Sequence, residues 1–315
     1  MPRSIEHWPL VQGPSRASHL ILKKFARVEL SDKFALMLQS PPVVLTIAGF
    51  DPSSGAGITA DIKTIAAHGC YGVAAITALT VQSTAGVGRV NPVDPQILQE
   101  SLSELMEDVK PAAVHIGMLG SAEIVIAVAS FLRQSQLPHV VLDTIFKSSS
   151  GTNLLDDNGI KALGQQLLPL AEVITPNAEE AGVLTGSQVA YVDDMRQAAQ
   201  KLHEMRAKGV VITGGHLDKA TDLLRLENGE VQMFKSERQE SSSTHGTGCA
   251  FSTAIACHLA LGRALPEAVL LSKAYITAAI ANAYSIGKGV GPVNHMYRMK
   301  NHPGGYVKKL ASGKD

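Results

Sequence analysis

Short apolar runs alternate with segments of helical hydrophobic period from residue 43 to residue 284. The apolar runs lack the polar alternation of a half-exposed strand, which predicts strands that are buried on both faces. The segments between them repeat apolar residues at spacings of three and four, as Leu98, Leu102 and Leu105 do, and this repeat predicts helices. The predicted strands are residues 43–48, 71–81, 113–117, 139–143, 172–175 and 210–213; the predicted helices are residues 58–68, 95–109, 122–133, 157–168, a segment from 179, 193–207, 250–261 and 266–284.

This order of strands and helices predicts an α/β fold, in which a mostly parallel sheet is covered by helices on both faces and ligands bind at the carboxyl ends of the strands. Residues 221–234 interrupt the order and predict a hairpin around Asn228-Gly229. We assign residues 41–296 to one domain and residues 297–315 to a C-terminal tail. We expect residues 1–40 to be an extension that is poorly ordered or precedes the true start, so a chain that begins at Met37 should fold.

Composition narrows the classes of function. Lysine plus arginine and aspartate plus glutamate number 28 each, so no net charge favours nucleic acid or an acidic membrane surface. The three cysteines form no C-x-x-C pair, which indicates a reducing compartment. No apolar run approaches the roughly 18 residues that span a bilayer. We therefore expect a soluble, cytoplasmic protein that binds a small molecule.

The stretch S-T-H-G-T-G-C at residues 243–249 is the strongest candidate for chemistry, because it opens an apolar helix. A helix that begins near Gly248 leaves its first backbone N–H groups unpaired, and these groups can bind an anion. Cys249 would lie in the first turn, where the helix dipole is expected to lower the pKa of the thiol. The same residues also fit a glycine turn before a core helix with a buried cysteine.

A second glycine motif, G-A-G-I-T-A at residues 55–60, fits the dinucleotide pattern G-x-G-x-x-G/A. That pattern needs an acidic residue about 20 positions further on to bind the ribose. The next strand ends in Thr80-Val81-Gln82, and the first carboxylate after Asp61 is Asp94. We therefore reject dinucleotide binding. Because the chain has no G-x-x-x-x-G-K-[ST] motif either, a nucleotide must be bound in another way.

Four ordered stretches together resemble hydroxymethylpyrimidine/phosphomethylpyrimidine kinase of thiamine biosynthesis, a family with a ribokinase-like fold. They are T-I-A-G-F-D-P-S-S-G-A-G at residues 46–57, T-A-L-T-V-Q-S-T at 77–84, T-P-N-A-E-E at 175–180 and T-H-G-T-G-C at 244–249. G-K-G-V-G-P-V at residues 287–293 is similar to the C-terminal signature of that family. The resemblance extends over about residues 43–296.

The resemblance implies a three-layer α/β kinase that uses ATP and Mg²⁺. Its substrates would be 4-amino-5-hydroxymethyl-2-methylpyrimidine and then the monophosphate of this compound, both bound at one site. Relatives are commonly homodimers. Two alternatives stay open at this point: a pyridoxal or pyridoxine kinase of the same superfamily, and a non-catalytic pyrimidine sensor that kept the pocket.

By this resemblance, the backbone N–H groups of Gly246, Thr247, Gly248 and Cys249 face the transferring phosphoryl group. Cys249 would be the base that accepts the hydroxymethyl proton. The amide of Gln82 can accept from the exocyclic amine of the pyrimidine and donate to a ring nitrogen. The other residues expected at the substrate are Gly49, Ala56, Asp61, Met118 and Ile145. Without the resemblance, Asp61 would fit a solvated residue and Met118 a core residue.

Carboxylates that follow strands are the candidates for the metal. Asp143 ends one predicted strand, and Glu180 belongs to an N-x-x-E element after another, so their oxygens suit Mg²⁺. Asp143 also fits a cap of the loop that follows it. The residues expected at the nucleotide are Lys147, Asn177 and Thr213.

The chain departs from the family pattern on the nucleotide side. Where the family commonly reads D-P-V-M-V-A-K-S-G, residues 143–151 read D-T-I-F-K-S-S-S-G, and Ser149 occupies the place of the lysine. Thr213 stands where a lysine often precedes the Gly-Gly-His element. Because both changes remove positive charge, we expect Lys147 to substitute for one of these lysines and hydroxyl or amide groups to bind phosphate at the other.

Overall fold

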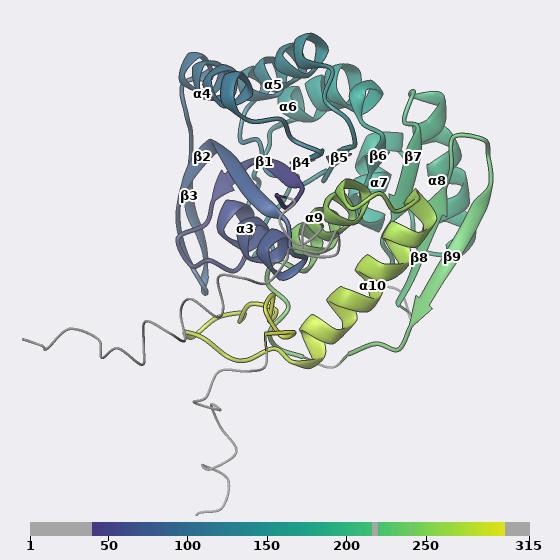
Figure 1. The fold of residues 1–315 in the computed structure, drawn as a ribbon. Coiled ribbons are helices and arrows are strands. Elements are labelled where there is room, and N and C mark those ends of the chain that lie inside the picture. Colours follow the sequence, from purple (N-terminus) through teal and green to yellow (C-terminus); the bar gives the residue numbers. More distant parts are fainter. Residues whose placement is uncertain (1–39, 216–219, 240, 300–315) are drawn as a thin grey trace, which may run out of the picture. The chain divides into compact units, whose positions relative to one another are not determined.

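The computed structural model describes residues 40–215, 220–239 and 241–299, and the expectations for residues 1–39 and 300–315 lie outside this part. A nine-stranded sheet runs in the order β3-β2-β1-β4-β5-β6-β7-β8-β9 (Figure 1). The strands are β1 (Val43–Phe50), β2 (Tyr71–Ser83), β3 (Gly86–Pro92), β4 (Ala113–Ile116), β5 (Val140–Leu142), β6 (Val173–Ile174), β7 (Gly209–Ile212), β8 (Ala220–Arg225) and β9 (Val231–Ser236).

The helices occupy the segments that the hydrophobic period predicts, with shifted ends. They are α3 (Gly57–Ala67), α4 (Pro95–Asp108), α5 (Ala122–Ser135), α6 (Asp157–Ala162), α7 (Ala178–Thr185), α8 (Val192–Glu204), α9 (Thr247–Ala260) and α10 (Leu265–Ala281). The predicted helix 157–168 is divided, because a π-helical turn (Leu163–Leu167) and a 3₁₀ turn (Leu168–Leu170) follow α6. Among the described helices, none is both long and apolar enough to cross a membrane.

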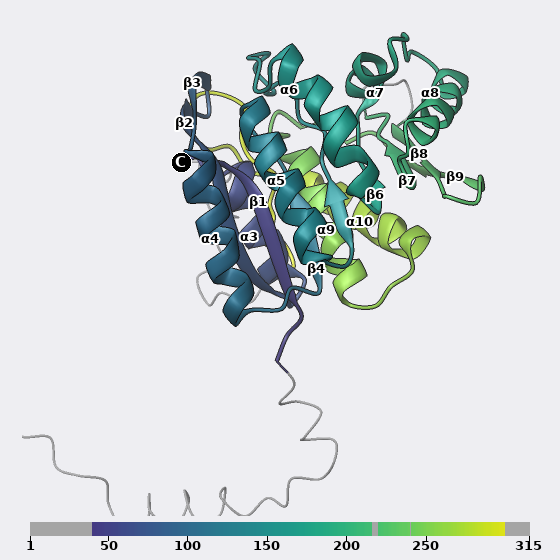
Figure 2. The ribbon, with the colours of Figure 1, turned by 90° about the horizontal axis from the view of Figure 1, so that it is seen from above.

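The six predicted strands form the parallel part of the sheet, from β2 through β1, β4, β5 and β6 to β7. Successive side chains of β1 point to opposite faces: Leu45 and Ile47 enter the core under α4 and α5, whereas Val44 enters the core under α9 and α10. Helices α4 to α8 cover the first face, and α3, α9 and α10 cover the second (Figures 1 and 2). The predicted three-layer α/β arrangement is therefore confirmed.

Three strands pair antiparallel at the edges of the sheet. The hairpin of β8 and β9 confirms the prediction, and Gly229 takes a left-handed conformation (φ +89°) in its turn. Strand β3 was not predicted, because G-V-G-R-V-N-P contains few apolar residues and no clear period. It pairs with the extended end of β2, where Leu79 lies opposite Asn91. Here the partner strand, rather than the local pattern, determines the structure.

Candidate active site

A cavity of about 1120 Å³ lies at the carboxyl ends of the parallel strands. The segments that follow neighbouring strands supply its wall, with Asp51 after β1, Asp143 after β5, Thr175 after β6 and Thr213 after β7. The structure brings all predicted site residues except Asp61 to this wall: Gly49, Ala56, Gln82, Met118, Asp143, Ile145, Lys147, Asn177, Glu180, Thr213, Gly246, Thr247, Gly248 and Cys249.

Two glycines bring the loop after β1 into direct contact with the segment before α9. Gly246 is the N-cap of α9 and has a positive φ of +81°, and a Cβ on it would collide with the carbonyl oxygen of Gly55. A Cβ on Gly55 would in turn collide with the imidazole of His245. The two glycine motifs of the sequence are thus required for packing against each other as well as for space near a ligand.

The first turn of α9 presents unpaired backbone amides to the cavity. Among the described residues, the amides of Gly246, Gly248 and Cys249 donate to no backbone or side-chain acceptor. Thr247 differs from this expectation, since its amide donates to the Thr244 carbonyl at 3.2 Å and its hydroxyl donates to the same oxygen at 2.7 Å. The predicted anion cradle therefore has three free donors, and the role predicted for the Thr247 amide is wrong.

The predicted pKa of Cys249 is also wrong. Its side chain is buried, and burial raises the pKa of the thiol well above its usual value, with further increases from the carboxylates of Asp143 and Asp61. The helix dipole contributes only about 0.3–1 kcal/mol, which is too little to offset the loss of solvation. At neutral pH, Cys249 is therefore a thiol.

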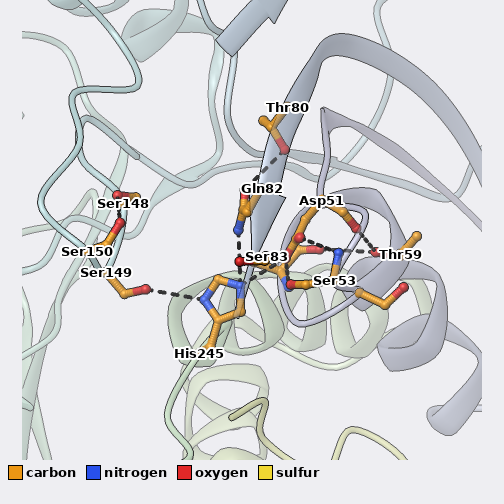
Figure 3. A network of polar contacts seen from close by, with 12 residues as sticks. Asp51, Ser53, Thr59, Thr80, Gln82, Ser83, Ser148, Ser149, Ser150 and His245 are labelled. Carbon is orange, nitrogen blue, oxygen red and sulfur yellow. Dashed lines mark hydrogen bonds and ion pairs between the residues drawn. The ribbon is translucent and has the colours of Figure 1, made fainter. Parts of the chain in front are cut away.

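A polar network surrounds His245, which lines the cavity (Figure 3). Its Nε2 lies 2.8 Å from Asp51 Oδ2 and 3.3 Å from Gln82 Nε2, and its Nδ1 lies 3.3 Å from Ser149 Oγ. Asp51 also accepts hydrogen bonds from the backbone amides of Ser53 at 2.7 Å and Ala56 at 3.0 Å. The imidazole of His245 therefore contacts three other segments of the chain, which contain Asp51, Gln82 and Ser149.

Asp51 and His245 received no role from the sequence, although both belong to the stretches that resemble the family. Burial raises the pKa of Asp51, but hydrogen bonds from His245, Ser53 and Ala56 outweigh burial and leave the pKa lowered. Asp51 is thus a buried carboxylate that stays ionised at neutral pH. A titratable residue inside a glycine-rich loop was the signal that could have identified each of them.

The residues predicted at the substrate line one part of the cavity. Thr80 Oγ1 lies 3.1 Å from Gln82 Oε1, so Gln82 is held between Thr80 and His245. Because His245 Nε2 donates its proton to Asp51, it cannot also accept from Gln82, so both donors and one acceptor site of the amide remain for a ligand. Met118 packs against Gly49, where an added Cβ would lie 2.9 Å from the methionine Cε. Gly49 therefore makes space for Met118 at the cavity wall.

Asp61 does not line the cavity, so its predicted position at the substrate is wrong. Its side chain is 0% exposed beneath the cavity wall. It accepts hydrogen bonds from Thr46 Oγ1 at 2.7 Å and from Thr253 Oγ1 at 2.9 Å. The alternative of a solvated residue is wrong as well, because Asp61 lies on the face of α3 that packs against β1 and α9.

The N-x-x-E element at residues 177–180 caps helix α7. Asn177 Oδ1 accepts from the Glu180 amide at 2.9 Å, and Glu180 Oε2 accepts from the Asn177 amide at 2.9 Å, which forms a reciprocal capping box. Burial raises the pKa of Glu180 to about 8, with a further contribution from the negative charge of Asp143. Burial likewise raises the pKa of Asp143 to about 6. Asp143 and Glu180 on the cavity wall thus have too little positive charge nearby to offset the effect of burial on their pKa values.

Lys147 is paired at the edge of the cavity. Its Nζ lies 2.6 Å from Glu179 Oε1, and both side chains are at least half exposed. The described part of the chain contains no cluster of three or more His, Cys, Asp and Glu residues suited to a metal. A metal at Asp143 and Glu180 would therefore take its remaining ligands from water or substrate, which is typical of Mg²⁺.

Comparisons with known proteins agree with this geometry. The phosphomethylpyrimidine kinase family matches residues 51–294. The hydroxymethylpyrimidine/phosphomethylpyrimidine kinase of Haemophilus influenzae is 44% identical over 259 residues, which cover 80% of this chain and 96% of that protein. The thiamine biosynthesis bifunctional protein ThiED of Geobacter sulfurreducens is 42% identical over 255 residues, which cover 80% of this chain but only 52% of that protein.

Among solved structures, the ADP complex of Bacillus subtilis pyridoxal kinase has a TM-score of 0.77 and 36% identity, with 83% of this chain and 100% of that chain covered. The fold, the cavity and these likenesses define a small-molecule phosphotransferase with a ribokinase-like three-layer α/β fold. More particularly, the chain belongs to the phosphomethylpyrimidine kinase family, as its four motifs predicted.

Proposed function

We propose that the protein transfers the γ-phosphoryl group of ATP to 4-amino-5-hydroxymethyl-2-methylpyrimidine and then to the monophosphate of this compound, in thiamine biosynthesis. The main support is the position of the free amides of Gly246, Gly248 and Cys249 on the wall that also contains Gln82. Phosphoryl transfer depends chiefly on positioning and on neutralisation of charge, and preorganised amides provide both.

The pyrimidine ring would bind between Gln82, Gly49, Ala56, Met118 and Ile145, all of which line the cavity. The hydroxymethyl group would then point toward the start of α9. Cys249 remains the proposed base for its proton, although its raised pKa makes the thiolate scarce at neutral pH. If Cys249 is the base, the reaction rate should therefore increase with pH.

The nucleotide would bind beside Asn177, Thr213 and Lys147. Asp143 and Glu180 fit Mg²⁺, because both are oxygen donors on the cavity wall and because burial raises the pKa of each, which a bound cation would offset. When bound, the ion would neutralise charge on the phosphates. Lys147 would exchange its contact with Glu179 for one with a phosphate.

The test is an incubation of the protein with ATP, Mg²⁺ and the hydroxymethylpyrimidine, with products followed by ³¹P NMR. We expect the monophosphate to appear first and the diphosphate second, with a stoichiometric loss of ATP. Binding of the pyrimidine without any phosphorylated product would instead establish the non-catalytic sensor.

Pyridoxal phosphorylation is the second candidate, because the Bacillus subtilis neighbour with a TM-score of 0.77 is a pyridoxal kinase. Both compounds are hydroxymethyl heterocycles, and the Gln82 amide could form a hydrogen bond with a ring nitrogen of either. The kcat/KM values of the two substrates, measured side by side, decide between the functions. A higher value for pyridoxal would overturn the first choice.

We further propose a cytoplasmic homodimer in which residues 41–296 form the kinase domain. Its support is the resemblance to the family, whose members are commonly homodimers. Sedimentation of the full chain and of a chain beginning at Met37 tests both statements. A monomer, or loss of soluble protein on truncation, would contradict them.

A further inference from the structure

A buried imidazole, that of His115 on β4, lies between two carboxylates. His115 is 0% exposed, and its Nδ1 lies 3.2 Å from Thr46 Oγ1 and 3.4 Å from Asp61 Oδ2. Thr46 donates its own proton to Asp61 at 2.7 Å, so the threonine oxygen is free to accept from the imidazole. Because both neighbours of Nδ1 are acceptors, Nδ1 of His115 carries a proton.

The other side of the imidazole leads to the cavity wall. His115 Nε2 lies 3.0 Å from the hydroxyl of Ser252, on the second turn of α9. The same hydroxyl lies 3.2 Å from Asp143 Oδ2 and 3.0 Å from the Gly248 carbonyl oxygen. A continuous chain of polar contacts thus connects Asp61, which lies beneath the cavity, to Asp143, which faces it.

The number of protons in this chain restricts how it is arranged. Ser252 has one proton to donate, and the possible acceptors include His115 Nε2 and the Asp143 carboxylate. If His115 is neutral with its proton on Nδ1, the Ser252 proton goes to Nε2, and Asp143 keeps only the longer side-chain hydrogen bond from the Thr175 hydroxyl at 3.4 Å. If both ring nitrogens carry protons, Nε2 donates to Ser252 and the hydroxyl is free to donate to Asp143. Only the second arrangement lets the Ser252 hydroxyl donate to Asp143 while Nε2 of His115 keeps a partner.

We propose that His115 is a buried imidazolium, held by Asp61, that orients the Ser252 hydroxyl toward Asp143 and thereby positions this carboxylate at the reacting phosphates. His115, Asp61 and Ser252 are then positioning residues, because none of them lines the cavity. This inference rests on the proposed function, in which Asp143 would hold the Mg²⁺ that neutralises charge on the phosphates.

The charges of the surroundings agree with this assignment. Burial disfavours the charged imidazole, but Asp61 and Asp143 outweigh burial and leave the pKa of His115 raised. Asp61 and His115 together form a neutral buried pair, which satisfies the requirement that a buried charge be paired and hydrogen-bonded. The arrangement of Asp61, His115 and Ser252 is not a nucleophilic triad, because Ser252 is 0% exposed and no substrate reaches it.

Nuclear magnetic resonance tests the charge state directly. In the full-length protein with ¹⁵N-labelled histidine, at neutral pH, we expect both ring nitrogens of His115 to carry protons. The His115→Gln variant assigns the signals, since the chain has 11 histidines. Asp61→Asn should convert His115 to the neutral form. A His115 with one ring proton in the wild type would overturn the proposal.

Kinetics tests the effect on Asp143. We expect Ser252→Ala to lower kcat about tenfold or more while the KM for the pyrimidine changes less than about twofold, since a hydrogen bond to a charged group is lost. The matched control is Ser272→Ala, which removes a buried hydroxyl that has no partner in the structure. This variant should retain wild-type kcat, and thermal unfolding of both variants should show that they are folded.

A wild-type kcat in folded Ser252→Ala would overturn the positioning role, even if His115 is doubly protonated. An equal loss in Ser272→Ala would overturn it as well, because the effect would then belong to core packing. If the wild type phosphorylates neither pyrimidine nor pyridoxal, the proposed function fails. The NMR measurement still decides whether His115 is the imidazolium that the proposal requires.

Discussion

The Asp51 carboxylate contacts His245 Nε2 at 2.8 Å across 194 positions of sequence. This contact joins the loop after β1 to the segment that leads into α9, and Gln82 and Ser149 approach the same imidazole (Figure 3). Two glycine motifs that are far apart in the sequence thereby form one wall of the cavity. The predictions below begin with this contact.

Asp51→Asn should lower the free energy of unfolding by about 1–3 kcal/mol, because it weakens charged hydrogen bonds inside the protein. Since the pKa of Asp51 is lowered from 3.8 in the folded state, its contribution is fully present above about pH 4 and decreases at lower pH. Urea unfolding of both proteins at several pH values measures the difference. Asp94→Asn is the control, because an exposed asparagine caps α4 as well as aspartate does. An equal loss of stability in both variants would contradict the prediction.

Cys249→Ala should lower kcat at least about tenfold and leave the affinity for the pyrimidine nearly unchanged. Burial raises the pKa of the thiol above 9.0, so the thiolate fraction and the wild-type kcat should both increase through the alkaline range. The variant should lack this increase. Steady-state kinetics as a function of pH, with calorimetric binding of the pyrimidine, checks both parts. Wild-type turnover in the variant would remove Cys249 from the role of base.

Glu180→Gln should make stability less dependent on pH in the absence of metal. The pKa of Glu180 is about 8 in the folded protein and 4.5 in the reference state, so the native state binds more protons in this interval and wild-type stability decreases as pH rises from about 4.5 to about 8. A glutamine side chain can keep the capping box but does not titrate. At the alkaline end of the interval, the free energy of unfolding of the variant should therefore exceed that of the wild type by at least about 1 kcal/mol.

Urea unfolding across this pH interval provides the measurement for Glu180→Gln. Glu179→Gln is a suitable control, because Glu179 occupies the same turn of α7 but its side chain is 68% exposed. Parallel pH dependences of the wild type and Glu180→Gln would show that Glu180 does not titrate in this range.

Lys147→Ala should raise the KM for ATP about two- to fivefold and leave kcat nearly unchanged, because an exposed ion pair with phosphate contributes only about 0.2–1 kcal/mol. Glu179→Gln releases Lys147 from its 2.6 Å contact and should leave the KM for ATP equal to or below the wild-type value. Initial rates at varied ATP concentration measure both. If the KM of Lys147→Ala equals that of the wild type, Lys147 does not substitute for the missing family lysines.

Lys273→Met should destabilise the protein by about 3–5 kcal/mol, since it leaves the carboxylate of Asp222 buried without its partner. Lys273 Nζ lies 2.8 Å from Asp222 Oδ2 and donates to the Ala220 carbonyl at 3.0 Å, and both residues of the pair are buried. Chemical denaturation of both single variants and of Asp222→Asn/Lys273→Met measures the coupling. The double variant should be more stable than Lys273→Met, and strictly additive losses would show that the pair is not coupled.

Local signals in the sequence predicted the elements that local physics controls. Most of the parallel strands are short, buried and largely apolar runs, although β2 alternates buried and exposed side chains, and the turn at Gly229 joins the predicted hairpin. Asp94 caps α4 through a 2.7 Å contact with the Gln96 amide, and Pro95 occupies the first position of this predicted helix. In each case the cause lies within a few residues of the effect.

The burial and the charge state of individual side chains could be determined only from the tertiary structure. Asp61 and Cys249 both lie near helix N-termini, where the sequence pattern is typical of accessible, dipole-stabilised groups. Strands β1 and β4 and the second turn of α9 enclose Asp61, whereas Asp143 and Asp61 raise the pKa of the Cys249 thiol. These neighbours come from segments that are up to 192 positions apart.

By itself, the sequence determined the order of most strands and helices, the family and a set of site residues of which all but Asp61 line the cavity, because repeated spacing and short motifs depend on neighbouring positions. Only the tertiary structure decided that β3 pairs with β2, that Asp51 contacts His245, and that Asp61 lies beneath the site. Solvation and Coulomb interactions depend on distance in space, and no local pattern specifies which remote side chains surround a given atom.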